Sequence, residues 1–200
     1  MKIVLVRHGE TEFRDKGLLD GMTDTAMNEN GTRQAKELAP KLKKYNFKKI
    51  FSSTLKRSID TAEIIKQELG LNLPIEKIES FREIDCGDCN GKSHESIGIE
   101  YPELVKEWAK NTDPPFPNGE SLKDVGERAL PEFLKIIKEN MGSDGDILIA
   151  GHGALNIALV GHFLKIPYGY RWKIKQSNCC INEISFGKDM EDYKVNKINC

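Results

Sequence analysis

Apolar residues occur along this chain in two patterns, short continuous runs and longer periodic runs. The first continuous run, Lys2–Val6, places aliphatic residues at successive positions after the lysine. A run of this kind indicates a strand that is buried on both faces, as in a parallel sheet covered by helices. The other predicted strands are Lys49–Ser52, Ile75–Ile78, Asp146–Ala150, Cys179–Phe186 and Tyr193–Ile198.

Between these runs, apolar residues recur at helical spacing. Asn28 is a suitable N-cap, and apolar residues then repeat every three or four positions as far as Tyr45. Leu55–Leu69 predicts a second amphipathic helix, which Gly70 ends, and Ala154–Leu164 predicts a packed helix. Strands that alternate with helices predict an α/β fold of three αβα layers, with a mostly parallel central sheet and helices on both faces.

Residues 85–120 interrupt this alternation. They are rich in glycine and proline, and only Pro102–Lys110 predicts a short helix. The segment has too few apolar residues for a core of its own. We therefore expect one domain over residues 1–200, with 85–120 as an insertion above the sheet that serves as a lid.

The charge of the chain excludes some classes of partner. It has 30 basic and 31 acidic residues, mixed along its 200 positions, so the net charge is −1. Such a surface does not attract nucleic acid or an anionic membrane, and no run approaches the roughly 18 apolar residues of a membrane span. The first residues do not form a signal peptide, and five cysteines are an odd number. We expect reduced thiols and a cytoplasmic protein.

Polar residues follow three of the predicted strands directly. Arg7 and His8 come after the first strand, Arg57 follows the second, and His152 follows the strand at Asp146–Ala150. Ligands of open α/β sheets bind beyond the carboxyl ends of the strands, so we expect these side chains to be neighbours in space. Two guanidinium groups, helix N-termini and adjacent glycines suit a phosphate dianion. An imidazole held there can also act as a nucleophile.

These segments resemble the histidine phosphatase superfamily, the group that contains cofactor-dependent phosphoglycerate mutase. The segment VLVRHGET is similar to its signature, and the resemblance covers nearly the whole chain. Further similar segments follow in family order: MNENGTRQA, IFSSTLKRSIDTAE, FREIDCGDCNGKS, PNGES, GHGALNIAL and NCCINEISF.

The resemblance implies a role for each of five residues. His8 would attack phosphorus and become phosphohistidine, while Arg7, Arg57 and His152 would hold the phosphoryl group and stabilise its charge. Glu83 matches the proton donor of the family, which protonates the leaving oxygen and then deprotonates the attacking water. The arginines would neutralise the phosphate, so we expect neither a metal ion nor another cofactor.

The resemblance also bears on substrate contacts. Four positions depart from the family pattern, and two of them, Arg14 and Leu18, correspond to positions that face substrate in the family. Arg14 stands where the family often has asparagine, and Leu18 stands where it often has arginine; Cys89 replaces a usual aromatic residue and Gly151 a usual serine. Arg14 is therefore a candidate to bind a second acidic group. The residues expected to bind substrate are Arg7, Thr11, Arg14, Gly21, Arg57, His152 and Gly153.

Several alternatives stay open. Asp85 or Asp88 could be the acid in place of Glu83, and the pair Cys86 and Cys89 could form a redox or zinc site. His94 is expected in a polar loop and His162 within a helix, both with structural roles. Lys165–Lys175 carries basic residues and is expected to be a solvated approach to a strand.

The expected activity is that of a metal-independent phosphomonoesterase acting on a small phosphorylated metabolite. At 200 residues the chain resembles the shorter phosphatase branch, which includes alpha-ribazole phosphatase and phosphoserine phosphatase. A bisphosphoglycerate-dependent phosphoglycerate mutase is the main alternative. A redox protein and a phosphoprotein-binding module are the rivals from other classes. A homodimer through an edge strand is compatible with the sequence, but nothing in the sequence selects it.

Overall fold

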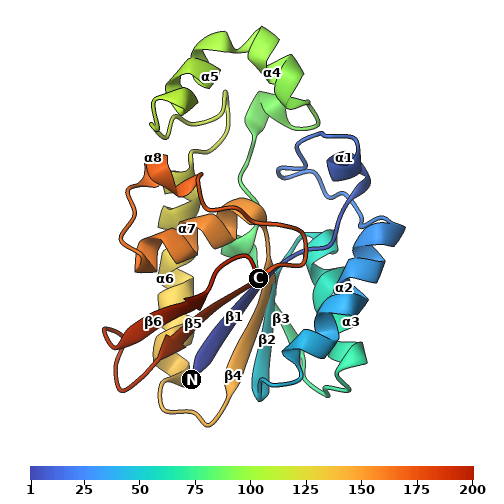
Figure 1. Ribbon diagram of the computed structural model, residues 1–200, viewed down its shortest axis with the longest axis vertical. Coiled ribbons are helices and arrows are strands. Elements are labelled where there is room, and N and C mark those ends of the chain that lie inside the picture. The colour runs from blue at the N-terminus through green and yellow to red at the C-terminus, as the bar shows by residue number, and fades with distance from the viewer.

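A six-stranded sheet in the order β3-β2-β4-β1-β5-β6 forms the centre of the computed structural model, which describes residues 1–200 (Figure 1). The four strands from β3 to β1 are parallel, and β5 and β6 add to this sheet in antiparallel fashion. The α/β prediction with a mostly parallel sheet is therefore confirmed. The strands are β1 (Lys2–Arg7), β2 (Phe47–Ser53), β3 (Ile75–Ile78), β4 (Asp146–Gly151), β5 (Ile181–Phe186) and β6 (Tyr193–Lys197).

The central strands are buried on both faces, as their continuous apolar runs predict. In β1, Val4 and Val6 pack toward α2 (Glu29–Leu42) and α3 (Lys56–Glu68), in one apolar cluster. The alternate residues Ile3 and Leu5 belong to a second cluster on the other face, with α6 (Leu122–Asn140) and α7 (Gly153–Phe163). The period of two along a strand thus divides one apolar run between two cores.

The first long helix begins where the sequence predicts. Asn28 has extended backbone and its side chain accepts a hydrogen bond from the backbone N–H of Gly31, so it is the N-cap of α2. The helix ends at Leu42, before Tyr45, which packs with the same apolar cluster from the following turn. Helix α3 agrees with the predicted Leu55–Leu69 to within one residue at each end.

Helix α6 is absent from the prediction, and it covers one face of the sheet. Its signals are present in the sequence: Ser121 and Asp124 form a capping box, and buried apolar residues then recur at helical spacing from Leu122 to Ile137. The segment that precedes Ser121 is rich in glycine and proline, so the sequence there indicates an irregular region and not the beginning of a helix. The predicted strand at Cys179–Phe186 begins only at Ile181.

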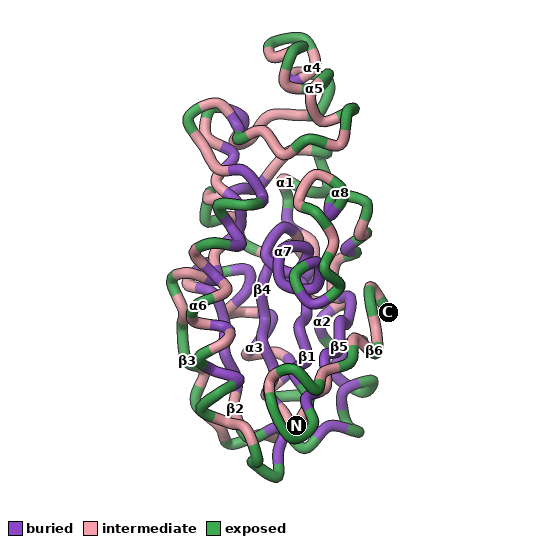
Figure 2. The backbone as a smooth tube through the Cα atoms, turned by 90° about the vertical axis from the view of Figure 1, so that its left-hand side faces the viewer, coloured by how far each residue is buried: buried purple, intermediate pink, exposed green.

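The insertion forms the end of the molecule farthest from the lower loops in Figure 1. It contains α4 (His94–Glu100) and α5 (Pro102–Ala109), and Figure 2 shows both helices as mainly exposed or half-buried. A third apolar cluster joins the insertion to the body, because Ile97 and Phe116 pack with residues of α6 and α7. The remaining short elements are α1 (Glu12–Asp15), η1 (Glu79–Phe81), η2 (Gly87–Cys89) and α8 (Tyr168–Arg171). That the insertion opens and closes as a lid stays a prediction.

No helix of the structure combines the length and the apolar character that crossing a membrane needs.

Candidate active site

Three strand ends bring two histidines and an arginine into direct contact. The Nε atom of Arg57 lies 3.3 Å from Nε2 of His8, and the ring centroids of His8 and His152 are 5.1 Å apart. All three residues are buried, with relative exposures of 1% or less. The neighbourhood expected from the strand ends is therefore present, although these residues lie far apart in the sequence.

Hydrogen bonds fix the tautomer of His8. Its Nδ1 lies 2.7 Å from the carbonyl oxygen of Gly9, and since a carbonyl can only accept, Nδ1 carries the proton. Nε2 therefore holds a lone pair, which accepts a hydrogen bond from Nε of Arg57. The asparagine side chain of Asn178 donates to the carbonyl of His8 and fixes the loop further. Nε2 is the nitrogen placed to act as a nucleophile.

Backbone carbonyls hold the guanidinium of Arg57 in place. One terminal nitrogen donates to the carbonyl of Gly21 and the other to the carbonyl of Thr23, each at 2.7 Å. Gly21 has φ +47°, and a Cβ there would collide with the side chain of Asn90. The loop after α1 thus reaches the site through its backbone, and it orients the arginine before any ligand binds.

Among the buried side-chain atoms that have no partner in the protein, two nitrogen atoms belong to Arg7 and His152. Nε2 of His152 lies 2.6 Å from the hydroxyl of Ser53, which leaves Nδ1 of the same ring without a partner. Arg7 donates from Nη1 to the carbonyl of Gln176 at 2.6 Å, while its Nε is unpartnered. Buried polar groups without partners are rare in proteins, so these two atoms point to a ligand that would supply acceptors.

The surroundings keep both imidazoles neutral. Burial lowers the pKa of His8 well below its ordinary value, and the positive charges of Arg57 and Arg7 lower it further. Burial also lowers the pKa of His152, followed by the charge of Arg57. A neutral His8 retains the lone pair on Nε2, which nucleophilic attack requires.

Glu83 lies at the N-terminus of α7, opposite the histidines. Its carboxylate oxygens accept hydrogen bonds from the backbone N–H groups of Gly153 and Ala154, both at 3.0 Å. One carboxylate oxygen of Glu83, one ring nitrogen of His8 and one ring nitrogen of His152 all lie within 4.8 Å of one another. The helix end therefore positions a carboxyl group beside the candidate nucleophile.

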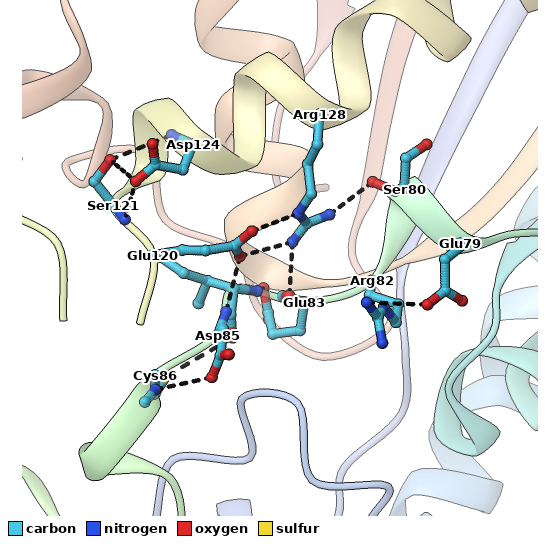
Figure 3. A network of polar contacts seen from close by, with 12 residues as sticks. Glu79, Ser80, Arg82, Glu83, Asp85, Cys86, Glu120, Ser121, Asp124 and Arg128 are labelled. Atoms are coloured by element: carbon cyan, nitrogen blue, oxygen red, sulfur yellow. Dashed lines mark hydrogen bonds and ion pairs between the residues drawn. The ribbon is translucent and has the colours of Figure 1, made fainter. Parts of the chain in front are cut away.

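A second arginine holds the backbone that carries Glu83. Figure 3 shows Arg128 of α6 donating to the carbonyls of Ser80 and Glu83, at 2.7 and 2.8 Å. The same guanidinium forms a two-pronged ion pair with Glu120, at 2.7 and 3.0 Å. Glu120 in turn accepts from the backbone N–H of Asp85. We call Arg128 and Glu120 the clamp, because they bind the chain on both sides of Glu83.

An open cavity of about 560 Å³ lies above these groups. Arg7 and Glu83 line its inner part, and Arg14 and Lys175 contribute positive charge to its wall. Apolar lining is supplied by Leu19, Ile84, Phe116, Ala154, Ile157, Trp172 and Ile174. The cavity therefore combines a cationic end, which suits a phosphate, with apolar walls that suit an organic group.

The site also contains three side chains of the types that bind metal ions. His8, Glu83 and His152 offer ligand atoms within 4.8 Å of one another. However, the guanidinium of Arg57 donates directly to Nε2 of His8, and Arg7 adds a second positive charge nearby. The charges around these ligands attract an anion and repel a cation.

The remaining predicted substrate contacts have different positions. Arg14 is exposed and lines the cavity, and Gly153 lines it beside Glu83. Thr11 is fully buried, and its hydroxyl donates to Asp20 and caps α1, so its contacts are with the protein. The substrate roles of all three residues stay predictions.

The structure also separates the alternatives for the acid. Asp85 accepts from the backbone N–H of Gly87, and Asp88 is exposed and bonded to Asn118. Neither aspartate lines the cavity, whereas Glu83 does. The geometry favours Glu83 because it alone combines access to the cavity with proximity to His8.

Cys86 and Cys89 are both free and buried. Burial raises the pKa of each thiol, which opposes the thiolate that redox chemistry and zinc binding require. The contacts of this pair are those of apolar residues, since both belong to the apolar cluster under the insertion.

Two further expectations were wrong. His94 is the first residue of α4 and lines the cavity, whereas a polar loop was expected. Lys165–Lys175 contains helix α8, and Arg171 within it is buried, with Nη1 donating to the carbonyl of Ala158. Its last residue, Lys175, lines the cavity, so this segment forms part of the site.

The sequence did not lead us to the residues that hold the candidate catalytic side chains in position. Ser53 and Gln176 hold His152 and Arg7, and the clamp holds Glu83. Ser53 stands at the end of a predicted strand, which is a usable signal. Gln176 acts through its backbone carbonyl, which no residue type reveals.

A family model described as histidine phosphatase superfamily (branch 1) matches residues 3–199. The 2,3-bisphosphoglycerate-dependent phosphoglycerate mutase of Cytophaga hutchinsonii is 32% identical over 82% of this chain and 78% of its own length. An uncharacterized phosphatase, PhoE of Bacillus subtilis, is 31% identical over 97% of this chain and 94% of its own length.

Solved structures agree with this assignment. A mycobacterial glucosyl-3-phosphoglycerate phosphatase superposes with a TM-score of 0.89 at 27% identity, covering 100% of this chain and 99% of its own. A mutant phosphoserine phosphatase of Entamoeba histolytica, in complex with phosphoserine, superposes with a TM-score of 0.85 at 27% identity, covering 99% of this chain and 96% of its own. Taken with the geometry of His8, Arg57 and His152, these similarities show that the chain belongs to the histidine phosphatase superfamily.

Proposed function

We propose that this protein is a metal-independent phosphomonoesterase that hydrolyses a small phosphorylated metabolite through a phosphohistidine intermediate. The observation that carries the proposal is the state of His8, whose Nδ1 donates to Gly9 while the lone pair of Nε2 faces Arg57. The unpartnered donors of Arg7 and His152 support a bound phosphoryl group, since its oxygens would satisfy both.

In the first step, Nε2 of His8 forms a bond to phosphorus as the ester P–O bond breaks. The carboxyl group of Glu83 gives its proton to the departing alcohol oxygen, which leaves as a neutral alcohol. Arg7, Arg57 and the free Nδ1 of His152 donate to the phosphoryl oxygens, whose negative charge is spread over them in the transition state.

In the second step, a water molecule enters from the cavity beside Glu83. The Glu83 carboxylate takes a proton from this water while its oxygen bonds to phosphorus and the P–N bond to His8 breaks. Inorganic phosphate leaves, and both residues return to their starting states. The open cavity supports hydrolysis, because Glu83, the group that would activate the water, lines it.

The extent of the similarities supports a phosphatase over a mutase. The match to the Bacillus subtilis phosphatase covers 97% of this chain, and that to the Cytophaga hutchinsonii mutase covers 82%. The phosphatase structures cover this chain almost completely from end to end. Alpha-ribazole phosphate, phosphoserine and glucosyl-3-phosphoglycerate are candidate substrates, because structural relatives act on or bind compounds of these names.

Hydrolysis of p-nitrophenyl phosphate in excess EDTA tests the proposal. We expect turnover that EDTA leaves unchanged and that His8→Ala abolishes. Acid-labile, alkali-stable label on the wild-type protein after incubation with 32P-labelled substrate would identify phosphohistidine. A protein that binds phosphate esters without turnover or label would instead be a phosphate-binding module.

The mutase is retained as a second candidate because several curated relatives at 32–37% identity are phosphoglycerate mutases. Interconversion of 2- and 3-phosphoglycerate that depends on a bisphosphoglycerate primer would establish it. Cys86→Ser tests the redox alternative, since full phosphatase activity of this variant excludes a need for the thiol pair.

A further inference from the structure

A small apolar space of about 220 Å³ adjoins the active-site cavity and shares three lining residues with it. Its walls come from four segments that are separate in the sequence. We call it the aromatic compartment, and its lining residues are His94, Trp108, Phe116 and Trp172. An apolar cavity of about 150 Å³ is large enough to bind benzene, so a single aromatic ring fits this space.

The rings of the aromatic compartment are held in place. Trp108 and Phe116 pack edge to face, with centroids 5.2 Å apart and an interplanar angle of 66°. The indole N–H of Trp172 lies 3.3 Å from Oδ1 of Asp113. Asp113 is itself fixed, because it accepts from two backbone N–H groups at the start of α6. The compartment is therefore formed before any ligand arrives.

Trp172 is nonetheless 39% exposed, although it is among the largest apolar side chains of the protein. An exposed indole facing other aromatic rings across an open space gains contact area when a flat apolar group enters. No aspartate, glutamate, lysine or arginine lines the compartment. Its chemistry therefore disfavours a second phosphate or carboxylate at this position.

The aromatic compartment lies next to the active-site cavity. His94, Phe116 and Trp172 line both the compartment and the larger cavity, whose inner wall carries Arg7 and Glu83. A substrate with its phosphate at Arg7 extends its leaving group past Glu83 into the cavity. The apolar wall of Ile84, Ile157 and Ile174 leads in the same cavity toward Phe116 and Trp172.

We infer that the aromatic compartment binds the leaving group of the substrate, and that this enzyme prefers phosphomonoesters whose alcohol carries an aromatic ring. This inference rests on the proposed phosphatase function and adds the class of the alcohol. Arg14 and Lys175, on the wall of the larger cavity, remain available to polar groups between the phosphate and the ring.

The test compares substrates whose alcohols differ in the ring but not in chemical reactivity. Benzyl, 2-phenylethyl and 3-phenylpropyl phosphates are measured against ethyl and propyl phosphates, since all five release alkanols of similar basicity. We expect kcat/KM of the best phenylalkyl ester to exceed that of the alkyl esters at least about tenfold, which corresponds to about 1.4 kcal/mol. The three phenylalkyl esters differ in the number of carbon atoms between the phosphate and the ring, so the best of them indicates the distance from the phosphate site to the compartment.

Variants then assign the preference to the compartment. Trp108→Ala and Trp172→Ala should each reduce the phenylalkyl preference, measured as the ratio of kcat/KM for the phenylalkyl ester to that for ethyl phosphate, severalfold, and Trp172→Phe should restore most of this ratio. Tyr170→Ala is the matched control, because Tyr170 is an exposed aromatic residue that does not line the cavity. Thermal unfolding of each variant shows whether it is folded.

The outcomes separate this inference from the proposed function. Hydrolysis of all five esters with equal kcat/KM would refute the role of the aromatic compartment in binding the leaving group, but it would still support the phosphatase function. Hydrolysis of none of them, nor of p-nitrophenyl phosphate, would overturn the phosphatase itself. A preference that survives in both tryptophan variants would place the ring elsewhere and also refute the inference.

Discussion

Replacing Arg128 by methionine tests whether the clamp positions Glu83 for proton transfer. Arg128 makes no contact with His8 or Arg57, but it donates to the carbonyl of Glu83 and to Glu120. Methionine keeps much of the length of the side chain and removes every hydrogen bond that it donates. The carboxylate of Glu83 would keep its hydrogen bonds from α7 and from the backbone N–H of Ile84, while the backbone carbonyl of Glu83 loses its bond to Arg128.

The magnitude follows from the groups left without partners. Arg128→Met removes the partners of the carbonyls of Ser80 and Glu83, and it leaves the carboxylate of Glu120 unpaired. Side-chain exposures of 22% and 21% make this pair largely but not fully buried. We expect a loss of about 2–3 kcal/mol of unfolding free energy, below the 3–5 kcal/mol of a fully buried pair.

The effect on catalysis depends on the leaving group. A general acid contributes about 10²- to 10⁴-fold when the alcohol must be protonated, and little when the leaving group is a stable anion. We expect kcat/KM of Arg128→Met for propyl phosphate to fall by about 10- to 100-fold, since part of this contribution is lost. For p-nitrophenyl phosphate, which releases nitrophenolate, the fall should be much smaller, because this leaving group departs without a proton from Glu83.

The assay is therefore the ratio of the two kcat/KM values, because this parameter reports phosphoryl transfer to His8 before hydrolysis. Arg82→Met is the matched control: Arg82 lies in the same segment but pairs with Glu79 at the surface (Figure 3). Arg128→Lys should recover part of the ratio. If Arg128→Met reduces both substrates by the same factor, the clamp contributes only to stability and the reasoning is wrong.

Three further predictions follow from other parts of the structure. Glu83→Gln should lower kcat/KM for propyl phosphate by about 10²-fold or more and affect p-nitrophenyl phosphate much less; equal losses would remove Glu83 as the acid. Burial and the nearby arginines lower the pKa of His8 and His152, so below about pH 6.5 the unfolded chain binds protons that the folded state does not. The free energy of unfolding should then fall as the pH falls from 6.5, by up to about 1.4 kcal/mol per pH unit for each histidine. Urea denaturation at several pH values should show that the unfolding free energy of His8→Asn depends less steeply on pH than that of the wild type. Gly31→Ala should lower the free energy of unfolding by about 1–3 kcal/mol because the new Cβ collides with the carbonyl of Glu10. Gly98→Ala, which has open space around it in α4, should leave the thermal unfolding temperature unchanged or raise it, whereas Gly31→Ala should lower it.

Local patterns were sufficient for the parts of the fold that depend on neighbouring residues. The continuous apolar run before Arg7 predicts a doubly buried strand, and Ile3–Val6 are fully buried. The cap at Asn28 gives the start of α2. Because parallel strands end at one edge of a sheet, the same patterns also predicted that His8, Arg57 and His152 would meet.

The tertiary structure decided how these residues are oriented. The lone pair on Nε2 of His8 depends on a carbonyl next to it in sequence and on Arg57 from another strand end. Glu83 competes with two nearby aspartates in the sequence, and only the N-terminus of α7 distinguishes it. The contacts of Arg57 with His8 and of Glu83 with α7 join segments many residues apart, so no periodic pattern in the sequence indicates them.

The sequence by itself thus determined the layers, the strand ends and the identity of the residues gathered there. It did not determine the clamp, in which Arg128 binds a carbonyl 45 residues earlier, or the aromatic compartment, whose rings come from four segments. The physical reason is the range of the interactions. Burial and capping are fixed by residues within a few positions, whereas a cavity wall and a backbone acceptor exist only after distant segments have packed together.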